Sequence, residues 1–358
     1  MQARARGAQA TINQQHLKHN LVQFRSMHAG PLIAVVKADA YGHGIEHVVP
    51  ALDAADAFAV ATIDEALQLR ALSPDKRIIL LEGVFNQDEL QLALEQSFDV
   101  IVHQKYQLAL LDLLQEKDNL CVWLKVDTGM NRLGFDLPFA RSVIPHLKQR
   151  STIDLHLMSH FAQSDQPLAP QTQQQIEANG WLEAQGLPFS FSNTGAVLSG
   201  LSKGNEWVRV GIGLFGISPL PTTAASDFKL KPVMNLQSKI IATKSISKGQ
   251  AVGYGAHFMA PKDMRLGIVG IGYADGYPWT QAKNLSVMLG QTACAVIGRV
   301  SMDMLAIDLS QLQETEPGAD VQLWGDCLSV ESLAETLDVI PYALICGITK
   351  RVKFHVIE

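Results

Sequence analysis

A lysine stands at the end of an apolar run in the stretch IAVVKADAYGHG, from Ile33 to Gly44. The run predicts a buried strand over residues 32–36, and lysine is a costly residue at the end of such a strand. Desolvation disfavours the charged form of a lysine, and a neutral amine can form a Schiff base with a carbonyl. Taken alone, Lys37 is more typical of a strand-end lysine whose amine reaches solvent. A covalent role for Lys37 therefore needs support from a second feature of the sequence.

That second observation is the stretch GIGLFG, from Gly211 to Gly216, which matches G-x-G-x-x-G. A dinucleotide fingerprint must open a helix, and the ISPLP that follows cannot continue one, so NAD binding is rejected. Small residues at this place instead let backbone N–H groups approach a phosphate. A reactive lysine and a phosphate site together predict pyridoxal phosphate. Arg209 is available as the partner that the ring nitrogen of this cofactor needs.

Eight short β-type apolar runs alternate with helical segments in the first 220 residues. These runs begin at Pro31, Ala57, Arg77, Phe98, Leu120, Ile153, Pro188 and Trp207. Strands that alternate with helices predict a parallel sheet, and eight such units predict a TIM-type (β/α)8 barrel. A doubly wound open sheet is the alternative fold.

The barrel prediction explains where the unusual polar residues lie. Barrel active sites form at the C-terminal ends of the strands. The polar residues in or just after the predicted strands are Lys37, Lys125, Asp127, Arg132, His160, Asn193, Thr194 and Arg209. We therefore expect these side chains to gather at one rim.

The pattern changes after residue 220. Short strands and glycine turns recur about every ten residues, which is typical of an all-β domain. We place a cofactor-binding barrel at residues 1–220 and a β-rich domain at residues 221–358.

Composition excludes several classes of protein. The formal net charge of −6 offers no basic field for nucleic acid, and no apolar run is long enough to span a membrane. The four cysteines form no CxxC pair, and the first residues do not resemble a signal peptide, so we expect a cytoplasmic protein. His156 and His160 have metal-ligand spacing, but no third ligand cluster accompanies them, and we predict no metal site.

Seven motifs resemble those of the alanine racemases, which are fold type III pyridoxal phosphate enzymes. In chain order they are AVVKADAYGHG, LKVDTGMNRLGF, SHFAQSD, RVGIGLFG, VGYGAHF, GIGYADGYPW and GRVSMDM. The resemblance spans nearly the whole chain. It implies a barrel with a C-terminal β-domain, a homodimer with shared active sites, and interconversion of L- and D-alanine for peptidoglycan synthesis or alanine breakdown. It also implies that residues 1–12 pack with the β-domain.

The resemblance assigns roles by motif position. Lys37 would hold the cofactor covalently and act as one catalytic base, and Tyr254 of the other subunit would be the second. Arg209 would face the pyridine nitrogen, and His160 would hydrogen-bond Tyr254. The phosphate would be held by Tyr41, Thr194, Gly211 and Ile212.

The substrate carboxylate would be bound by Arg132 and the backbone of Met302. Lys125 matches a position that is carbamylated in some members, and a plain ion pair with Asp127 is an equal alternative. Two positions depart from the family pattern. Thr194 replaces a common serine but keeps its hydroxyl, and Lys350 stands where some members have a phosphate-binding tyrosine.

Two other functions use related architectures. A non-catalytic pyridoxal phosphate carrier resembles the barrel alone, and the residues after 220 argue against it. A decarboxylase on the same two-domain plan usually has a catalytic cysteine near the C-terminus, and Cys327 and Cys346 keep this alternative open.

Overall fold

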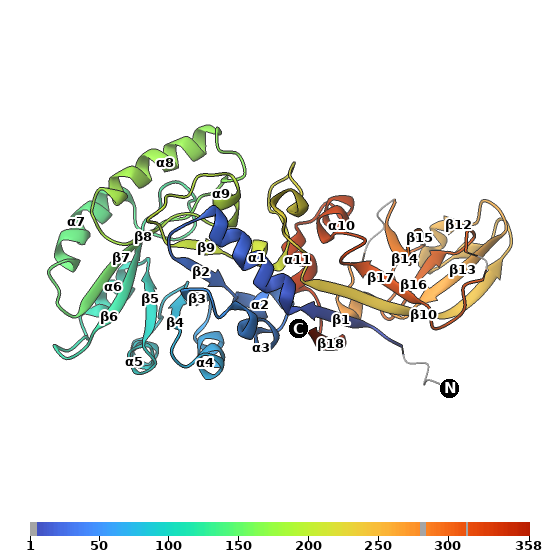
Figure 1. The fold of residues 1–358 in the computed structure, drawn as a ribbon, viewed down its shortest axis with the longest axis horizontal. Helices are drawn as coiled ribbons and strands as arrows, with labels where there is room; N and C mark the ends of the chain where they lie inside the picture. Colours follow the sequence, from blue (N-terminus) through green and yellow to red (C-terminus); the bar gives the residue numbers. More distant parts are fainter. Residues whose placement is uncertain (1–5, 280–283, 313) are drawn as a thin grey trace. The chain divides into compact units, whose positions relative to one another are not determined.

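A computed structural model describes residues 6–279, 284–312 and 314–358 of the chain (Figure 1). The described residues form two compact units. One, the barrel unit, comprises Lys18–Leu214 and Ser218–Leu230. The other, the β unit, comprises the described residues up to Leu17, together with Phe215–Ile217 and Lys231–Glu358.

The barrel unit is built on one sheet of eight parallel strands, in the order β8-β7-β6-β5-β4-β3-β2-β9. Their bounds are β2 Leu32–Val35, β3 Ala57–Val60, β4 Arg77–Leu80, β5 Phe98–Val102, β6 Leu120–Lys125, β7 Ile153–Met158, β8 Phe189–Ser190 and β9 Val208–Val210. The sheet closes because Trp207 N donates to Phe189 O and Arg209 N donates to Ser192 O. The predicted (β/α)8 barrel is therefore confirmed, and the open-sheet alternative is wrong.

Helices follow most of the strands and lie around the outside of the barrel (Figure 1). Their bounds are α1 Gln14–Met27, α2 Lys37–Gly42, α3 Ile45–Val48, α4 Ile63–Leu72, α5 Gln87–Glu95, α6 Lys105–Leu111, α7 Leu137–Leu147, α8 Pro170–Glu183 and α9 Thr194–Leu198. Capping residues in the local sequence determine where several of these helices begin. Asn86 and Asp136 cap the first turns of α5 and α7 by accepting a backbone N–H.

The two ends of the barrel have different chemistry. Side chains alternate along a strand, so Cys121, Trp123 and Lys125 share one face of β6. Cys121 lies where the strand enters the barrel, and Lys125 lies where it leaves. We call the entry end, with Arg77, Asp99, Cys121, Asp154 and His156, the N-terminal mouth. We call the exit end, with Lys37, Lys125, Arg132, His160 and Arg209, the C-terminal mouth.

The β unit contains an eight-stranded sheet in the order β13-β16-β15-β14-β17-β10-β1-β18, and β13 also pairs with β10. The strands are β1 Gln9–Asn13, β10 Met234–Ile246, β13 Met264–Val269, β14 Ser286–Leu289, β15 Thr292–Ile297, β16 Leu305–Asp308, β17 Asp320–Trp324 and β18 Lys353–Ile357. A hairpin of β11 (Ala251–Val252) and β12 (Phe258–Met259) and two helices, α10 (Val330–Leu337) and α11 (Pro341–Cys346), complete the unit. The predicted all-β C-terminal domain is thus present, with two short helices added.

The start of the described chain belongs to this unit. β1 pairs antiparallel with β10 and parallel with β18. Arg6 donates to the buried carboxylate of Asp275 at 2.7 Å. Among the described residues, no helix combines the length and the hydropathy needed to cross a membrane.

Candidate active site

Lys37 follows β2 directly and begins a turn of unusual handedness. The four residues from Ala38 to Tyr41 have φ between 52° and 53°, which is left-handed although none of them is glycine. Left-handed helical geometry costs about 1–2 kcal/mol per L-residue, so the surrounding fold must impose it. Glu65 helps to do so, because its Oε1 accepts from Ala38 N at 2.6 Å. Strain of this kind is typical of a functional site.

The turn brings Tyr41 against Gly211, which follows β9. A Cβ on Gly211 would come within 2.3 Å of the Tyr41 hydroxyl oxygen, so only glycine fits there. Gly211 N donates to Thr194 Oγ1 at 3.0 Å, and Ile212 opens the adjoining 3-10 helix. The structure therefore brings the hydroxyl-bearing residues Tyr41 and Thr194 together beside the backbone of Gly211, all of them buried, and such a grouping of hydroxyl and backbone groups suits a phosphate.

Arg209 lies at the centre of the C-terminal mouth and is buried. Its two terminal nitrogens make five hydrogen bonds, to Ser190 O and Oγ, Ser159 O, Phe191 O and His160 Nδ1. The bond to His160 Nδ1 is 2.8 Å long. No hydrogen bond of the Arg209 Nε–H is recorded among the described residues, so this donor is available to a ligand.

Burial and positive charge set the protonation of these groups. Burial, Arg209 and Lys125 together hold the pKa of His160 well below its usual range, so this imidazole is neutral. Because it is neutral, its Nδ1 can accept the hydrogen bond from Arg209. Burial lowers the pKa of Arg209 to about 10, against the attraction of Glu206. Arg209 is therefore still a cation at neutral pH.

Lys125 is a buried amine without a carboxylate partner. Burial, Arg209, Arg132 and Lys37 lower its pKa to about 7. Asp127, the predicted ion-pair partner, instead accepts three backbone N–H groups of the following turn with its Oδ1. No ion pair of Lys125 occurs among the described residues, so the ion-pair alternative is wrong for this structure. Lys125, Arg132 and His160 line one narrow crevice, which has no room for a water-sized group.

Two predicted site residues belong to the β unit. Tyr254 begins a short 3-10 helix and is 72% exposed. Met302 is also exposed, and its carbonyl accepts from Ala274 N at 3.0 Å. Lys350 lies in the same unit and is exposed. Tyr254 and Met302 thus present their surfaces outward from their own unit.

Several supporting residues were not predicted. Glu65 positions the left-handed turn, and its T-x-x-E capping box with Thr62 is visible in the sequence. Glu206 is buried near Arg209 and accepts from Ser192 N and Phe191 N. Gln175 is fully buried and donates to His160 O at 2.9 Å. The sequence gives no signal for Glu206 or Gln175, because their partners come from distant segments.

Comparisons with known proteins cover both parts of the chain. A family model described as alanine racemase, N-terminal domain, matches residues 12–219, and one described as alanine racemase, C-terminal domain, matches residues 233–356. An alanine racemase of Xanthomonas campestris is 41% identical over 356 residues, which is 98% of each chain.

Solved structures agree with these matches. The biosynthetic alanine racemase of Pseudomonas aeruginosa superposes with a TM-score of 0.94 at 39% identity, over 99% of this chain and 100% of that one. The alanine racemase of Bartonella henselae, described with covalently bound pyridoxal phosphate, gives a TM-score of 0.88 at 28% identity. That likeness covers 98% of this chain and 99% of the Bartonella chain.

Proposed function

The chain belongs to the alanine racemase family and interconverts L- and D-alanine, and we propose how its own residues divide this work. The observation that carries the proposal is the C-terminal mouth. There Lys37, on its strained turn, lies close enough to Lys125 and His160 to help lower the pKa of both groups, and Arg209 acts on the same two groups. A carrier made of the barrel alone does not fit, because the chain also has the C-terminal domain of the family.

The residues of this mouth fit pyridoxal phosphate. At the cradle of Tyr41, Thr194 and Gly211, the Tyr41 hydroxyl can lie against the backbone of position 211 because that residue carries no Cβ. Ile212 would add its backbone N–H. The Arg209 Nε–H would face the pyridine nitrogen, and the amine of Lys37 would hold the cofactor covalently. When bound, this cofactor supplies the electron sink that makes the α-proton of alanine removable.

Arg209 would keep the pyridine nitrogen without a proton. Its pKa of about 10 means that it holds its own proton at neutral pH. An arginine that stays charged can donate a hydrogen bond but does not transfer the proton. By holding its proton, Arg209 would weaken the electron sink that the cofactor supplies and so favour return of the proton to Cα over side reactions.

Lys37 and Tyr254 would act as the two bases. Racemization removes the α-proton from one face of the substrate and returns a proton to the other face, so two opposed bases avoid a large movement of one group. Lys37 would take the proton from D-alanine, and Tyr254 would take it from L-alanine. His160 would hydrogen-bond the Tyr254 hydroxyl, because Arg209 fixes this imidazole through Nδ1.

The substrate carboxylate would bind to Arg132 and to the backbone N–H of Met302. Arg132 lies close enough to Lys125 to lower the pKa of that amine, so a carboxylate bound to Arg132 would lie in a cationic environment. A neutral amine can react with carbon dioxide, and a pKa of about 7 leaves much of Lys125 neutral at physiological pH. The resulting carbamate would be an anion that pairs with Arg132 and holds its guanidinium in place.

We propose a homodimer in which Tyr254 of each chain serves the barrel of its partner. The β unit exposes several large apolar side chains, and that of Tyr254 is among them. They are Tyr254, Tyr273, Trp279, Met302 and Met304. Arg299 stacks on Trp279 at 5.8 Å from the ring centre, and its guanidinium lies beside Gly255. An apolar surface of this kind is typical of a face that another chain covers.

The experiment is proton exchange in deuterated water with Tyr254→Phe. This variant should still exchange the α-proton of D-alanine, barely exchange that of L-alanine, and lose most racemization. Lys37→Ala should bind no covalent cofactor and serves as the inactive reference. Equal exchange from both enantiomers would show that one base serves both faces. Carbon dioxide release from candidate amino acids, followed in parallel, would instead indicate a decarboxylase.

A further inference from the structure

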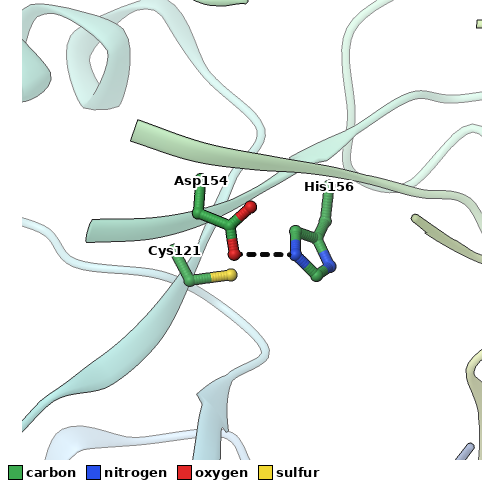
Figure 2. A group of neighbouring side chains, drawn as sticks. All are labelled: Cys121, Asp154 and His156. Carbon is green, nitrogen blue, oxygen red and sulfur yellow. Dashed lines mark hydrogen bonds and ion pairs between the residues drawn. The ribbon is translucent and has the colours of Figure 1, made fainter. Parts of the chain in front are cut away.

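Three side chains with metal-binding atoms converge at the N-terminal mouth of the barrel. Cys121 lies on β6, and Asp154 and His156 lie on β7. Cys121 and Asp154 are direct cross-strand partners, and His156 is two residues farther along the same face. Figure 2 shows the three side chains turned toward a common point, and their sulfur, oxygen and nitrogen atoms lie within 4.8 Å of one another.

We propose that Cys121, Asp154 and His156 bind one Zn²⁺ ion, with water as the fourth ligand. A thiolate, an imidazole and a carboxylate form a donor set that zinc accepts in tetrahedral sites. This site lies at the opposite end of the barrel from the residues assigned to racemization. It does not depend on the proposed roles of those residues.

The geometry needs only a small adjustment. Tetrahedral zinc bond lengths imply ligand atoms about 3.5 Å apart. His156 Nε2 and Asp154 Oδ2 are already 3.0 Å apart, so zinc would replace the proton that they now share. The Asp154 side chain is 58% exposed and can move, and its exposure gives an ion access from solvent.

The imidazole of His156 is already oriented for this role. Its ring packs on Trp123 with the ring centres 4.4 Å apart, and the residue is buried. Its Nδ1 is buried and has no hydrogen-bond partner among the described residues. This nitrogen can therefore carry the ring proton when Nε2 binds the metal.

The charges around the cluster favour a divalent cation. The nearest cation, Arg77, is paired with Asp99 through an Nε–Oδ2 bond of 2.6 Å. Its other end donates to Cys121 Sγ at 2.7 Å, a bond that would also support a metal-bound thiolate. The thiol releases its proton to solvent when zinc binds. The thiolate and Asp154 then carry two negative charges, which Zn²⁺ balances.

A zinc ion at this place would fasten β6 to β7 where both strands enter the barrel. Residues at the N-terminal face of such barrels serve stability, because the reacting groups are at the other end. The expected consequence is a higher melting temperature with an unchanged racemization rate, since a ligand of the native state stabilises it by mass action.

The test uses untagged holoenzyme freed of metal by a chelator and then dialysed against zinc. We expect about one zinc per chain by elemental analysis and a melting temperature raised by a few degrees. Cys121→Ser and the surface change Asp154→Asn should each weaken binding at least tenfold and remove the thermal shift. Cys327→Ser, which alters an exposed cysteine of the β unit, is the matched control and should bind zinc normally.

Cobalt gives a second measurement. Co²⁺ in the native site should show the visible d–d bands of tetrahedral coordination with a thiolate, and Cys121→Ser should lose them. Equal zinc binding by native protein and Cys121→Ser would place the metal elsewhere and overturn the proposal. Absence of bound zinc from the native protein would overturn it too.

Discussion

The two mouths of one barrel are built on the same strands and have opposite electrostatics. At the N-terminal mouth, Arg77 is paired with Asp99, and Asp154 bonds to His156. At the C-terminal mouth, Lys125 is buried without an acidic partner. A single strand, β6, carries Cys121 at one end and Lys125 at the other.

Protonation shows the same contrast. Burial lowers the pKa of Lys125 to about 7, and the nearby cations Arg209, Arg132 and Lys37 add to this effect and outweigh the attraction of Asp127. At the other mouth burial also lowers the pKa of Arg77, but Asp99 and Cys121 outweigh it and raise the pKa overall. Burial and the charge of Asp99 raise the pKa of the Cys121 thiol. The C-terminal mouth thus gathers cationic groups that suit anions such as phosphate and carboxylate, whereas at the N-terminal mouth the cation Arg77 is already paired with Asp99.

The comparison indicates that the C-terminal mouth is less stable than it could be, because its buried cations serve ligand binding. Unpaired buried cations are destabilising, and they persist where a ligand will compensate for them. Changes at the C-terminal mouth should therefore lower activity without lowering stability, and removal of an unpaired cation there should raise stability. Changes at the N-terminal mouth should do the reverse.

The largest effect is expected for Lys37→Ala. The proposed roles of Lys37 as covalent anchor and catalytic base mean that kcat should fall at least about a thousandfold. Stability should change little. Coupled assays of D-alanine formation measure the rate, and borohydride reduction of native protein should fix the cofactor on the peptide that contains Lys37. Lys117→Ala, at an exposed lysine of the same unit, is the control and should remain fully active.

The Lys37→Ala variant also tests whether each active site is shared between two subunits. Lys37→Ala chains mixed with Tyr254→Phe chains should regain activity, since one of the two hybrid sites has both bases. Verified heterodimers without any recovery would contradict sharing, and a label on another peptide would contradict the assignment of Lys37.

A smaller effect is expected for Lys125→Met. The folded-state pKa of about 7 lies below the ordinary 10.5, so the unfolded chain binds the extra proton between these values. Stability of the native protein therefore rises with pH from about 7 to 10.5, and the full penalty applies below 7. Methionine removes this penalty, and the variant should gain about 1–3 kcal/mol at pH 6 and little near pH 10. Its kcat should fall about tenfold if Lys125 helps to position Arg132.

Denaturant unfolding of carbon dioxide-free protein at several pH values measures how the free energy of unfolding of Lys125→Met and native protein changes with pH. Lys105→Met, which removes a lysine at the start of α6, should show no such pH-dependent gain. A destabilised Lys125→Met at pH 6 would mean that the amine is compensated in the native protein. Reversal of the gain on addition of bicarbonate would identify a carbamate as the compensating group.

Much of this arrangement could be predicted from sequence. The eight apolar runs gave the barrel strands, because parallel strands buried on both faces need continuous apolar residues. Lys37, His160, Thr194 and Arg209 were predicted at one rim because each comes at or after the end of a strand.

Other features depend on tertiary contacts. Residues 38–41 have no glycine, so nothing local predicts their left-handed backbone. The ion pair of Lys125 with Asp127, one of two equal alternatives for Lys125, was suggested by alternation along a strand. However, β6 ends at Lys125, and Asp127 follows the geometry of the next turn instead. Cys121 meets Asp154 and His156 only through the register of β6 with β7, which the sequence does not specify.

The smallest effect on activity is expected for Asp99→Asn at the N-terminal mouth. Asp99 is buried and receives Arg77 Nε at 2.6 Å and Trp123 Nε1 at 2.8 Å on the same oxygen. Asparagine keeps an oxygen for the tryptophan but removes the charge that offsets Arg77. Removing one member of a buried ion pair leaves the other uncompensated, and the partial exposure of Arg77 reduces this penalty, so we expect a loss of about 2 kcal/mol. Because no group of the C-terminal mouth contacts this pair, kcat should stay within about twofold of native, as expected for a change remote from the reacting atoms.

Asp112→Asn, in the exposed ion pair with Arg150, is the matched control and should cost less than about 1 kcal/mol. Unfolding in urea measures the loss in free energy of unfolding, and initial rates measured on the same preparations give the change in kcat. A variant that keeps its stability but loses activity would show that the two mouths are coupled, and the division between them would be wrong.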